Sequence, residues 1–413
     1  MDFEQISVVN VKYCCGSTII PVGRIAWINR KIFFEYAPDF IGLGLELSPF
    51  KLPVRQGAVE CEDRVFDGLF GVFNDSLPDG WGRLLLDRKL RKMKLNPDAL
   101  TPLDRLCYVG SRGMGALMYE PEISTDVPYP LQEDLDVLAS ECIQFQENDD
   151  ECVVDELLAL SGSSAGARPK ILICLPNKTN IRMEDDPDIA RSNWLIKFRS
   201  SADPRDVGSI EYAYHLMAAD AGLEVPEARL FASKKQGGYF GVKRFDRQQS
   251  LFLHMHTFSG LLHIDHRIPN VDYKTLMKVT FWLTKDDREN EKQFRNVVFN
   301  VLTHNRDDHP KNFSFLMDHN GVWKVSPAYD LIFSSGPGGE HHTTIMGEGK
   351  NPGVTHLLQL ASVASIKTRR ALAIIDQVKA AVSKWPLFAE IALVSSQSRD
   401  AIQKKLISVS QNK

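Results

Sequence analysis

The residues of this chain best suited to chemistry lie in one short polar stretch, His304-Asn305-Arg306-Asp307-Asp308-His309-Pro310-Lys311-Asn312. Asn312 stands five positions after Asp307, and Asp330 follows beyond a gap long enough for a hairpin. This is the order of the carboxylate base and the two magnesium ligands in protein-kinase-like phosphoryl-transfer sites. Taken alone, the stretch also fits a polar loop between a helix and a strand, because Asp and Asn are common turn residues.

A loop of small residues lies upstream and leads into the apolar run from Ile171 to Leu175. Because few Cβ atoms obstruct it, its backbone N–H groups could approach phosphate oxygens. An ordinary flexible hairpin is an equally good interpretation of the loop by itself. The loop reads Ser161-Gly162-Ser163-Ser164-Ala165-Gly166-Ala167-Arg168-Pro169-Lys170, and its candidate ATP-binding residues are Ser164, Ala165, Gly166, Ala167 and Lys170.

A lysine on a strand supplies the third part of the pattern. In residues 194–198 the alternation of side chains puts Trp194, Ile196 and Phe198 on one face and Lys197 on the other. Lys197 could hold the α and β phosphates of ATP, although a lysine there is usually just the wet face of a strand. Helical spacing from 210 to 221 follows, and Glu211 is the candidate partner of Lys197; an exposed first-turn glutamate is the alternative.

Further elements should position the polar stretch. Residues 239–245 read as a strand, and an apolar stripe from Phe294 to Leu302 predicts a buried helix that ends just before His304. Such a helix would fix the catalytic loop rigidly. Helices are also predicted over 81–88, 131–146, 368–383 and 398–408, whereas residues 335–353 are too rich in Gly and Pro to pack regularly.

Composition agrees with a cytoplasmic enzyme. The chain has 413 residues, 43% of them hydrophobic, and a net charge of −4, which gives no overall basic field for nucleic acid. Its 7 cysteines are scattered and read as reduced thiols. No apolar run reaches the roughly 20 residues that span a membrane, and the start of the chain is acidic rather than signal-like. We therefore expect a soluble cytoplasmic protein with no membrane partner.

Together these motifs resemble those of the HipA family, the serine/threonine-kinase toxins of bacterial toxin–antitoxin systems. The resemblance runs from about residue 15 to about residue 390. It is carried by Asp75-Ser76-Leu77-Pro78-Asp79-Gly80-Trp81-Gly82-Arg83, by Val109 to Leu117, by Gly166 to Lys170, by Lys243-Arg244-Phe245-Asp246-Arg247 and by Asn305 to Ser314.

The resemblance implies roles for individual residues. It assigns the base to Asp307, which spacing alone does not separate from Asp308, and it places adenine near the main chain of Lys243 and the ring of Phe245. ATP and Mg²⁺ would be the cofactors, with Asn312 and Asp330 as metal ligands, Lys311 near the γ-phosphate and His309 a structural hydrogen-bonder. The self-inhibitory autophosphorylation site would be Ser163, with Ser161 and Ser164 close enough to compete.

The same resemblance implies partners. A HipB-like DNA-binding antitoxin is expected, because this chain shows no helix-turn-helix with a basic recognition helix, and DNA would be reached only through that partner. The protein substrate is expected to be an aminoacyl-tRNA synthetase. The predicted fold is α+β, a protein-kinase-like bilobal fold with a β-rich N-terminal subdomain over 1–125, a region like a kinase N-lobe over 150–250 and a helical C-lobe over 251–413.

Two other functions remain open. His304, Asp307, Asp308, His309, His341 and His342 could form the metal cluster of a nuclease, but that would leave the small-residue loop and Lys197 without a role. An inactive kinase-like module that acts only as an antitoxin partner is the other alternative. An active enzyme is favoured because the chain retains Lys197, Asp307, Asn312 and Asp330.

Overall fold

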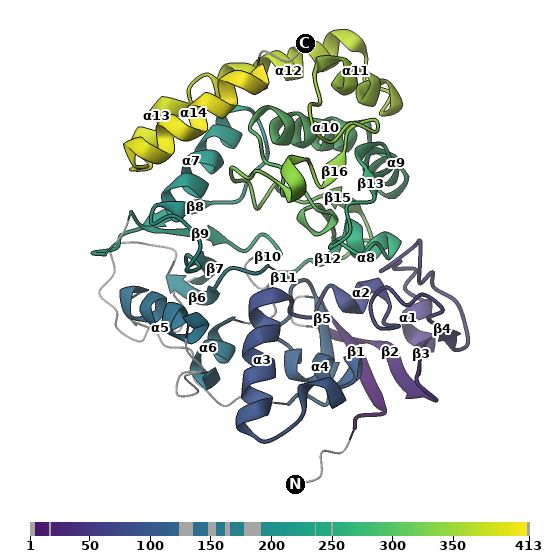
Figure 1. The fold of residues 1–413 in the computed structure, drawn as a ribbon. Coiled ribbons are helices and arrows are strands. Elements are labelled where there is room, and N and C mark those ends of the chain that lie inside the picture. The colour runs from purple at the N-terminus through teal and green to yellow at the C-terminus, as the bar shows by residue number, and fades with distance from the viewer. Residues whose placement is uncertain are drawn as a thin grey trace.

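The computed structural model describes residues 5–15, 18–123, 135–147, 154–161, 166–176, 191–235, 237–248 and 251–410. Figure 1 shows a β-rich N-terminal region at one end, a helical C-terminal region at the other, and a second sheet with its helices between them. This arrangement confirms the predicted α+β fold. No helix within the described residues has the length and apolar character needed to cross a membrane.

The N-terminal subdomain is built on an antiparallel sheet with strand order β4-β3-β2-β1-β5. Alternation along β1 buries Val9, Val11 and Tyr13, so one face of the sheet packs on the core. The strands are β1 (Val8–Cys15), β2 (Thr18–Ile28), β3 (Lys31–Tyr36), β4 (Val59–Glu60) and β5 (Leu117–Glu120). The helices are α1 (Pro38–Ile41), α2 (Gly71–Asn74), α3 (Gly80–Lys92) and α4 (Pro102–Val109), with the 3₁₀ turn η1 (Pro97–Ala99).

The middle region carries a four-stranded sheet with order β6-β7-β9-β8. Trp194 and Ile196 on β7 and Phe198 just after it are at most 1% exposed, as their alternation predicted. The strands are β6 (Lys170–Pro176), β7 (Arg191–Lys197), β8 (Ala228–Phe231) and β9 (Tyr239–Lys243), and the helices are α5 (Leu135–Glu147), α6 (Val154–Ser161) and α7 (Val207–Asp220). The first four residues of the helix predicted over 131–146 lie outside the described residues.

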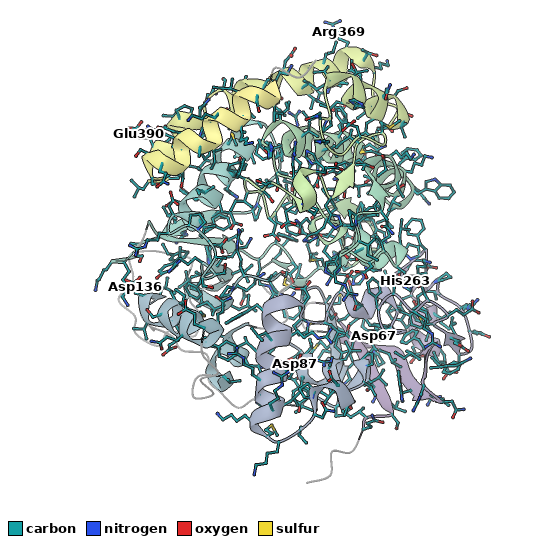
Figure 2. The ribbon with its side chains drawn as sticks, viewed as in Figure 1. Asp67, Asp87, Asp136, His263, Arg369 and Glu390 are labelled. Atoms are coloured by element: carbon teal, nitrogen blue, oxygen red, sulfur yellow. The ribbon has the colours of Figure 1, made fainter. Side chains whose placement is uncertain are left out.

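Helix α5 is fixed to this sheet through its first turn. The Asp136 carboxylate, labelled in Figure 2, accepts hydrogen bonds from the Ser233 hydroxyl, the Lys234 amide and the Tyr239 hydroxyl. Phe145 near the other end of α5 packs edge-on against Trp81 of α3, with ring centroids 5.5 Å apart. The middle region therefore shares a buried cluster with the N-terminal subdomain.

The C-terminal region is mainly helical, and its central helix α10 (Asp287–Leu302) begins at Asp286, whose carboxylate caps the Arg288 amide. Phe294, Val297 and Val298 of the predicted stripe are fully buried. The other helices are α8 (Phe258–Leu262), α9 (Tyr273–Thr284), α11 (Val354–Val363), α12 (Thr368–Val382), α13 (Trp385–Ile391) and α14 (Ser396–Ser410). Arg369 of α12 and Glu390 of α13 project from the outer surface of this region (Figure 2).

Short strands join the helices to the polar stretch. One sheet has the order β12-β14-β15, formed by β12 (His254–Thr257), β14 (Ser314–Met317) and β15 (Trp323–Val325). Two strand pairs are made by β10 (Arg247–Gln248) with β11 (Leu251–Phe252) and by β13 (Val271–Asp272) with β16 (Thr343–Thr344). The 3₁₀ turns η2 (Pro310–Asn312) and η3 (Pro337–Gly339) complete the chain.

The prediction that residues 335–353 do not pack regularly is wrong for the middle of that stretch. His341, His342 and Thr343 are at most 6% exposed, and β16 pairs in parallel with β13. The physical reason is a buried acceptor, since the Asp308 carboxylate binds the His341 ring and the amides of His342 and Thr343. Hydrogen bonds to a buried charge outweigh the weak local preferences of the surrounding sequence.

The N-terminal subdomain is joined to the rest of the chain by buried polar contacts. Asp75 accepts hydrogen bonds from the His256 ring at 2.6 Å and from the Thr257 amide at 2.7 Å. His263, at the end of α8, accepts from the Gly71 amide at 2.8 Å and lies at the boundary between the two regions in Figure 2. Because these groups are buried and paired, separating the regions would leave unsatisfied charges.

Candidate active site

Two lysines face one cleft from neighbouring strands. Lys170 on β6 and Lys197 on β7 stand directly opposite each other in the register of the antiparallel pair. Both line what we call the central cleft, together with Glu211 of α7 and Asp330. The Lys197 ammonium donates to Glu211 Oε1 at 2.5 Å and also to Asp330 Oδ1. The predicted contact between Lys197 and Glu211 is thus present.

The charges of this cluster hold one another in their ionised forms. Burial alone would lower the pKa of Lys197, but the Asp330 and Glu211 carboxylates outweigh it and raise the pKa above its usual range. Burial opposes ionisation of Asp330 as well, yet the two lysine ammonium groups hold its pKa far below the usual range. Burial lowers the pKa of Lys170 to about 8, against the upward influence of Asp330.

The loop predicted to be catalytic begins where α10 ends. His304 adopts a left-handed conformation with φ of 56°, and its ring Nδ1–H donates to the Ser334 carbonyl at 3.0 Å. Asp307 follows and is exposed. The side-chain amide of Asn312 donates to the Asp307 carbonyl at 2.7 Å, which closes the loop on itself. Asp330 also has positive φ, 53°, so both ends of the site use strained backbone.

Burial separates the two adjacent aspartates that spacing could not. Asp308 is 1% exposed, and its carboxylate is occupied by the Tyr273 hydroxyl, the His341 ring and two backbone amides. Burial would raise the pKa of Asp308, but these donors, above all His341, keep it below its usual range. Asp308 therefore anchors the loop, and Asp307 is the carboxylate with free access to solvent.

The Nδ1 atom of His309 does not make the structural hydrogen bond that was expected of this residue. Its ring lies beside those of His266 and His342, with centroids 5.6 and 5.9 Å away. Its Nδ1 is buried and has no hydrogen-bond partner among the described residues. This three-histidine cluster could not be predicted, because His266 lies far from residues 304–312 along the chain.

Asp79 is a site residue that the sequence argument missed. The Lys311 ammonium donates to Asp79 Oδ2 at 2.9 Å, and the Gly166 amide donates to Asp79 Oδ1. Asp79 stands just before α3 in the N-terminal subdomain, so it reaches the cleft from outside the kinase-like region. Its place in the motif from Asp75 to Arg83 was the feature of the sequence that could have indicated a role for Asp79.

The residues predicted to lie near adenine line the same cleft. Phe245 is half-buried, and its ring centroid lies 5.6 Å from that of Tyr329. Lys243 lines the cleft too, but its backbone N–H donates to the Glu227 carbonyl, and the Arg244 N–H donates to the Asn193 carbonyl. These two backbone N–H groups are therefore already paired within the structure, and the placement of adenine near Lys243 and Phe245 stays a prediction.

The small-residue loop is described only at its end. Gly162, Ser163, Ser164 and Ala165 lie outside the described residues, and so does the side chain of Ser161. Gly166 has φ of 110°, and the Lys170 ammonium fills the space where a Cβ would stand. Glycine is favoured at this position because side chains rarely tolerate a φ of 110°.

The donor set fits magnesium. Asp330 and Asn312 line the same cleft, and both offer oxygen, which a hard cation prefers. The amide nitrogen of Asn312 is taken by the Asp307 carbonyl, so its oxygen is directed away from that bond. The Asp330 side chain is 35% exposed and lies opposite Lys197 and Lys170, the groups expected to bind phosphate. Asn312 and Asp330 are therefore the residues that would hold a magnesium ion.

The geometry does not support the nuclease alternative. Across the described ranges, no group of three or more His, Cys, Asp or Glu side chains is arranged to hold a metal ion. Two members of the supposed cluster are engaged elsewhere, His304 with the Ser334 carbonyl and His341 with Asp308.

A β-rich region and a helical region that enclose a lysine–glutamate pair and an Asp-x4-Asn loop define a kinase-like α+β fold. Residues 162–385 match the HipA-like C-terminal domain, and residues 18–120 match the HipA N-terminal domain. The chain belongs to the HipA family.

Individual relatives are distant. The chain is 23% identical over 280 residues to a Sinorhizobium fredii protein named "Putative kinase Y4dM", covering 64% of each chain. It is 24% identical over 184 residues to a Haemophilus influenzae protein named "Putative kinase", covering 41% of this chain and 52% of that one. The match thus spans less than two thirds of either relative.

A solved structure has the same fold. It is that of HipA from Shewanella oneidensis, determined in complex with HipB and its operator DNA. The TM-score is 0.67 with 14% sequence identity, and the match covers 97% of this chain and 95% of that one.

Proposed function

We propose that this chain is an ATP-dependent serine/threonine protein kinase that acts as the toxin of a toxin–antitoxin pair. The observation that carries the proposal is the buried Lys197, bonded to both Glu211 and Asp330 at the cleft that Asn312 and Lys311 also line. A cation held between a helix carboxylate and a potential metal ligand is the arrangement that protein kinases use to position nucleotide phosphates.

Each charged group has a task in this proposal. Lys197 and Lys170 bind the α and β phosphates, and Lys311 neutralises the γ-phosphate. Asn312 and Asp330 hold Mg²⁺, which supplies further charge neutralisation on the phosphate oxygens when bound. Because phosphoryl transfer needs little covalent help from the protein, positioning and charge neutralisation supply most of the rate.

Asp307 is the proposed base for the acceptor hydroxyl. Its carboxylate is exposed, so a serine or threonine from another protein can reach it, and proton acceptance by a positioned carboxylate is a common form of general base catalysis. Asp308 cannot take the role, because four donors already occupy its oxygens.

We extend the proposal to partners. The Shewanella oneidensis HipA was solved with HipB and operator DNA, and a HipB-like antitoxin is the corresponding partner for this chain, with DNA reached only through it. An aminoacyl-tRNA synthetase is the proposed substrate. Phosphate on Ser163, or on Ser161 or Ser164, adds roughly −1.5 to −2 charges to a loop that must receive ATP, and so would inhibit the kinase.

The test is transfer of labelled phosphate from ATP. Asp307→Gln should keep nucleotide binding and lose transfer by at least about a hundredfold, the usual range for a general base. Asp400→Asn, on the exposed surface of α14, is the matched control and should retain full activity. Full activity of Asp307→Gln would refute the assignment of the base.

A second assay addresses the substrate and the self-inhibition. Purified protein with magnesium ATP is incubated with a panel of aminoacyl-tRNA synthetases, and phosphosites are mapped by mass spectrometry. Modification of an unrelated protein but of no synthetase would refute the proposed substrate, and phosphate found only outside 161–164 would refute the proposed self-inhibition. Nucleotide binding without any transfer would favour the inactive module instead.

A further inference from the structure

The corner formed by Asp79, Gly80 and Trp81 contacts the end of the small-residue loop. The Trp81 amide donates to the Gly166 carbonyl at 3.1 Å, and the Gly166 amide donates to the Asp79 carboxylate. Gly80 has φ of 37°, and a Cβ there would lie 2.6 Å from the Ala167 Cα. The approach of α3 to the loop is therefore so close that only glycine fits between them.

The same carboxylate binds the catalytic loop. Asp79 Oδ2 lies 2.9 Å from the Lys311 ammonium, although the two residues are 232 positions apart in the chain. Lys311 is 7% exposed and lies in the 3₁₀ turn that contains Asn312. Asp79 thus connects the two segments that must meet around the terminal phosphate, the small-residue loop and the catalytic loop.

The pair also lies between two cavities. Asp79 and Lys311 line the central cleft, and they also line a second cavity between the N-terminal subdomain and His266. Lys311 therefore stands at the junction of the two cavities.

We propose that Asp79 is a positioning residue of the kinase site, supplied by the N-terminal subdomain, which holds Lys311 and the Gly166 amide in register for the γ-phosphate. The inference rests on the proposed function. It makes the N-terminal subdomain part of the active site, because α3 cannot move without moving both phosphate-binding segments.

The charge of Asp79 has a predictable effect on ATP. Burial alone would raise the pKa of Asp79, but the Lys311 ammonium and the Gly166 amide hold it below its usual range, so the carboxylate is ionised at neutral pH. An anion here competes with the γ-phosphate for Lys311 and repels it. Asp79 should therefore weaken ground-state binding of ATP while it aligns Lys311 for transfer, a combination that raises kcat.

The test separates binding from turnover. Asp79→Asn should lower kcat at least about tenfold and tighten the Kd for a fluorescent ATP analogue about fivefold, equivalent to roughly 1 kcal/mol. Asp79→Glu keeps the charge and should bind the analogue as the wild type does. In a Lys311→Met background Asp79→Asn should not lower kcat further, since its effect passes through the lysine. Asp98→Asn, exposed on the same outer cavity, is the control.

The outcomes are distinct. Asp79→Asn could instead weaken analogue binding and lower kcat by the same factor, in both the wild-type and the Lys311→Met backgrounds. That result would mean a merely structural role and would overturn the inference. Unchanged kcat and Kd in Asp79→Asn would overturn it as well. If the wild type binds the analogue but transfers no phosphate, the proposed function fails. The effect of Asp79 on bound nucleotide can still be tested in that case, because it requires a lower Kd for Asp79→Asn than for Asp79→Glu.

Discussion

The buried Asp246 should be one of the most sensitive positions for stability. Its carboxylate is fully buried and accepts from Arg244 at 2.7 Å, from Arg247 at 2.6 Å and from the Gly115 amide at 2.8 Å. Both arginines also donate to the Gly113 carbonyl, so this cluster attaches the N-terminal loop before β5 to the chain after β9. Replacing Asp246 by Asn keeps the shape and removes the charge.

The expected loss is large because two buried cations would lose their partner. Removing one member of a buried ion pair costs about 3–5 kcal/mol, and the new amide hydrogens would point toward donors. With a urea m value of about 3 kcal/mol/M, the unfolding midpoint should fall by about 1–1.7 M. The exposed pair of Arg24 and Glu35 is the matched control, and Glu35→Gln should cost at most about 1 kcal/mol.

The pH dependence of unfolding provides an independent test that the charge of Asp246 stabilises the folded state. Burial alone would raise the pKa of Asp246, but the two arginines hold it below its usual range. Since the folded pKa is lower than the unfolded value of about 3.9, the stabilisation is present above that pH and is lost as the pH falls through the folded pKa. The difference in urea unfolding midpoint between the wild type and Asp246→Asn should therefore become smaller below about pH 4. If Asp246→Asn lowered the urea unfolding midpoint at neutral pH no more than Glu35→Gln does, the argument would be refuted.

Three other substitutions test the site. Glu211→Gln should reduce phosphoryl transfer at least about tenfold, because Lys197 loses one of its two carboxylates, and transfer assays with ATP titration would contradict this if kcat and KM stayed unchanged. Gly80→Ala should weaken ATP binding because the added Cβ meets the backbone of the small-residue loop. Gly57 also has positive φ but lies in open space, so Gly57→Ala should leave ATP binding unchanged. Equal ATP affinities of the two variants would show that the close contact is unimportant. Asp308→Asn should lower the thermal unfolding midpoint by several degrees, corresponding to about 3 kcal/mol for a buried anion with several donors, and calorimetry would detect its absence.

Local patterns were sufficient to predict the elements that carry the site. Strict alternation fixed the buried face of β7, and the helical stripe fixed the end of α10 next to the catalytic loop. The Lys197 to Glu211 contact followed from the order of a strand and the next helix. These predictions succeeded because each depends on side chains that are neighbours along one element or across one connection.

Local patterns could not decide the role of a residue where distant segments meet. Asp307 and Asp308 are adjacent in sequence and differ only through the donors that surround Asp308, which come from α9 and from residues 341–343. The same donors order a stretch that composition alone assigns to an irregular loop. Asp79 could not be assigned to the catalytic loop because nothing local marks a contact across 232 positions.

The wide spacing of the site residues has a consequence during protein synthesis. Asp79 is made early, Lys197 and Glu211 near the middle, and Asp330 late, so the ribosome completes the N-terminal subdomain long before the rest of the cleft exists. A nascent or prematurely ended chain that lacks Asp330 still contains the small-residue loop and both strand lysines, but it lacks the carboxylate that faces them. On the proposed function, we expect products that end before Asp330 to transfer no phosphate, because the cleft would lack one of its two magnesium ligands.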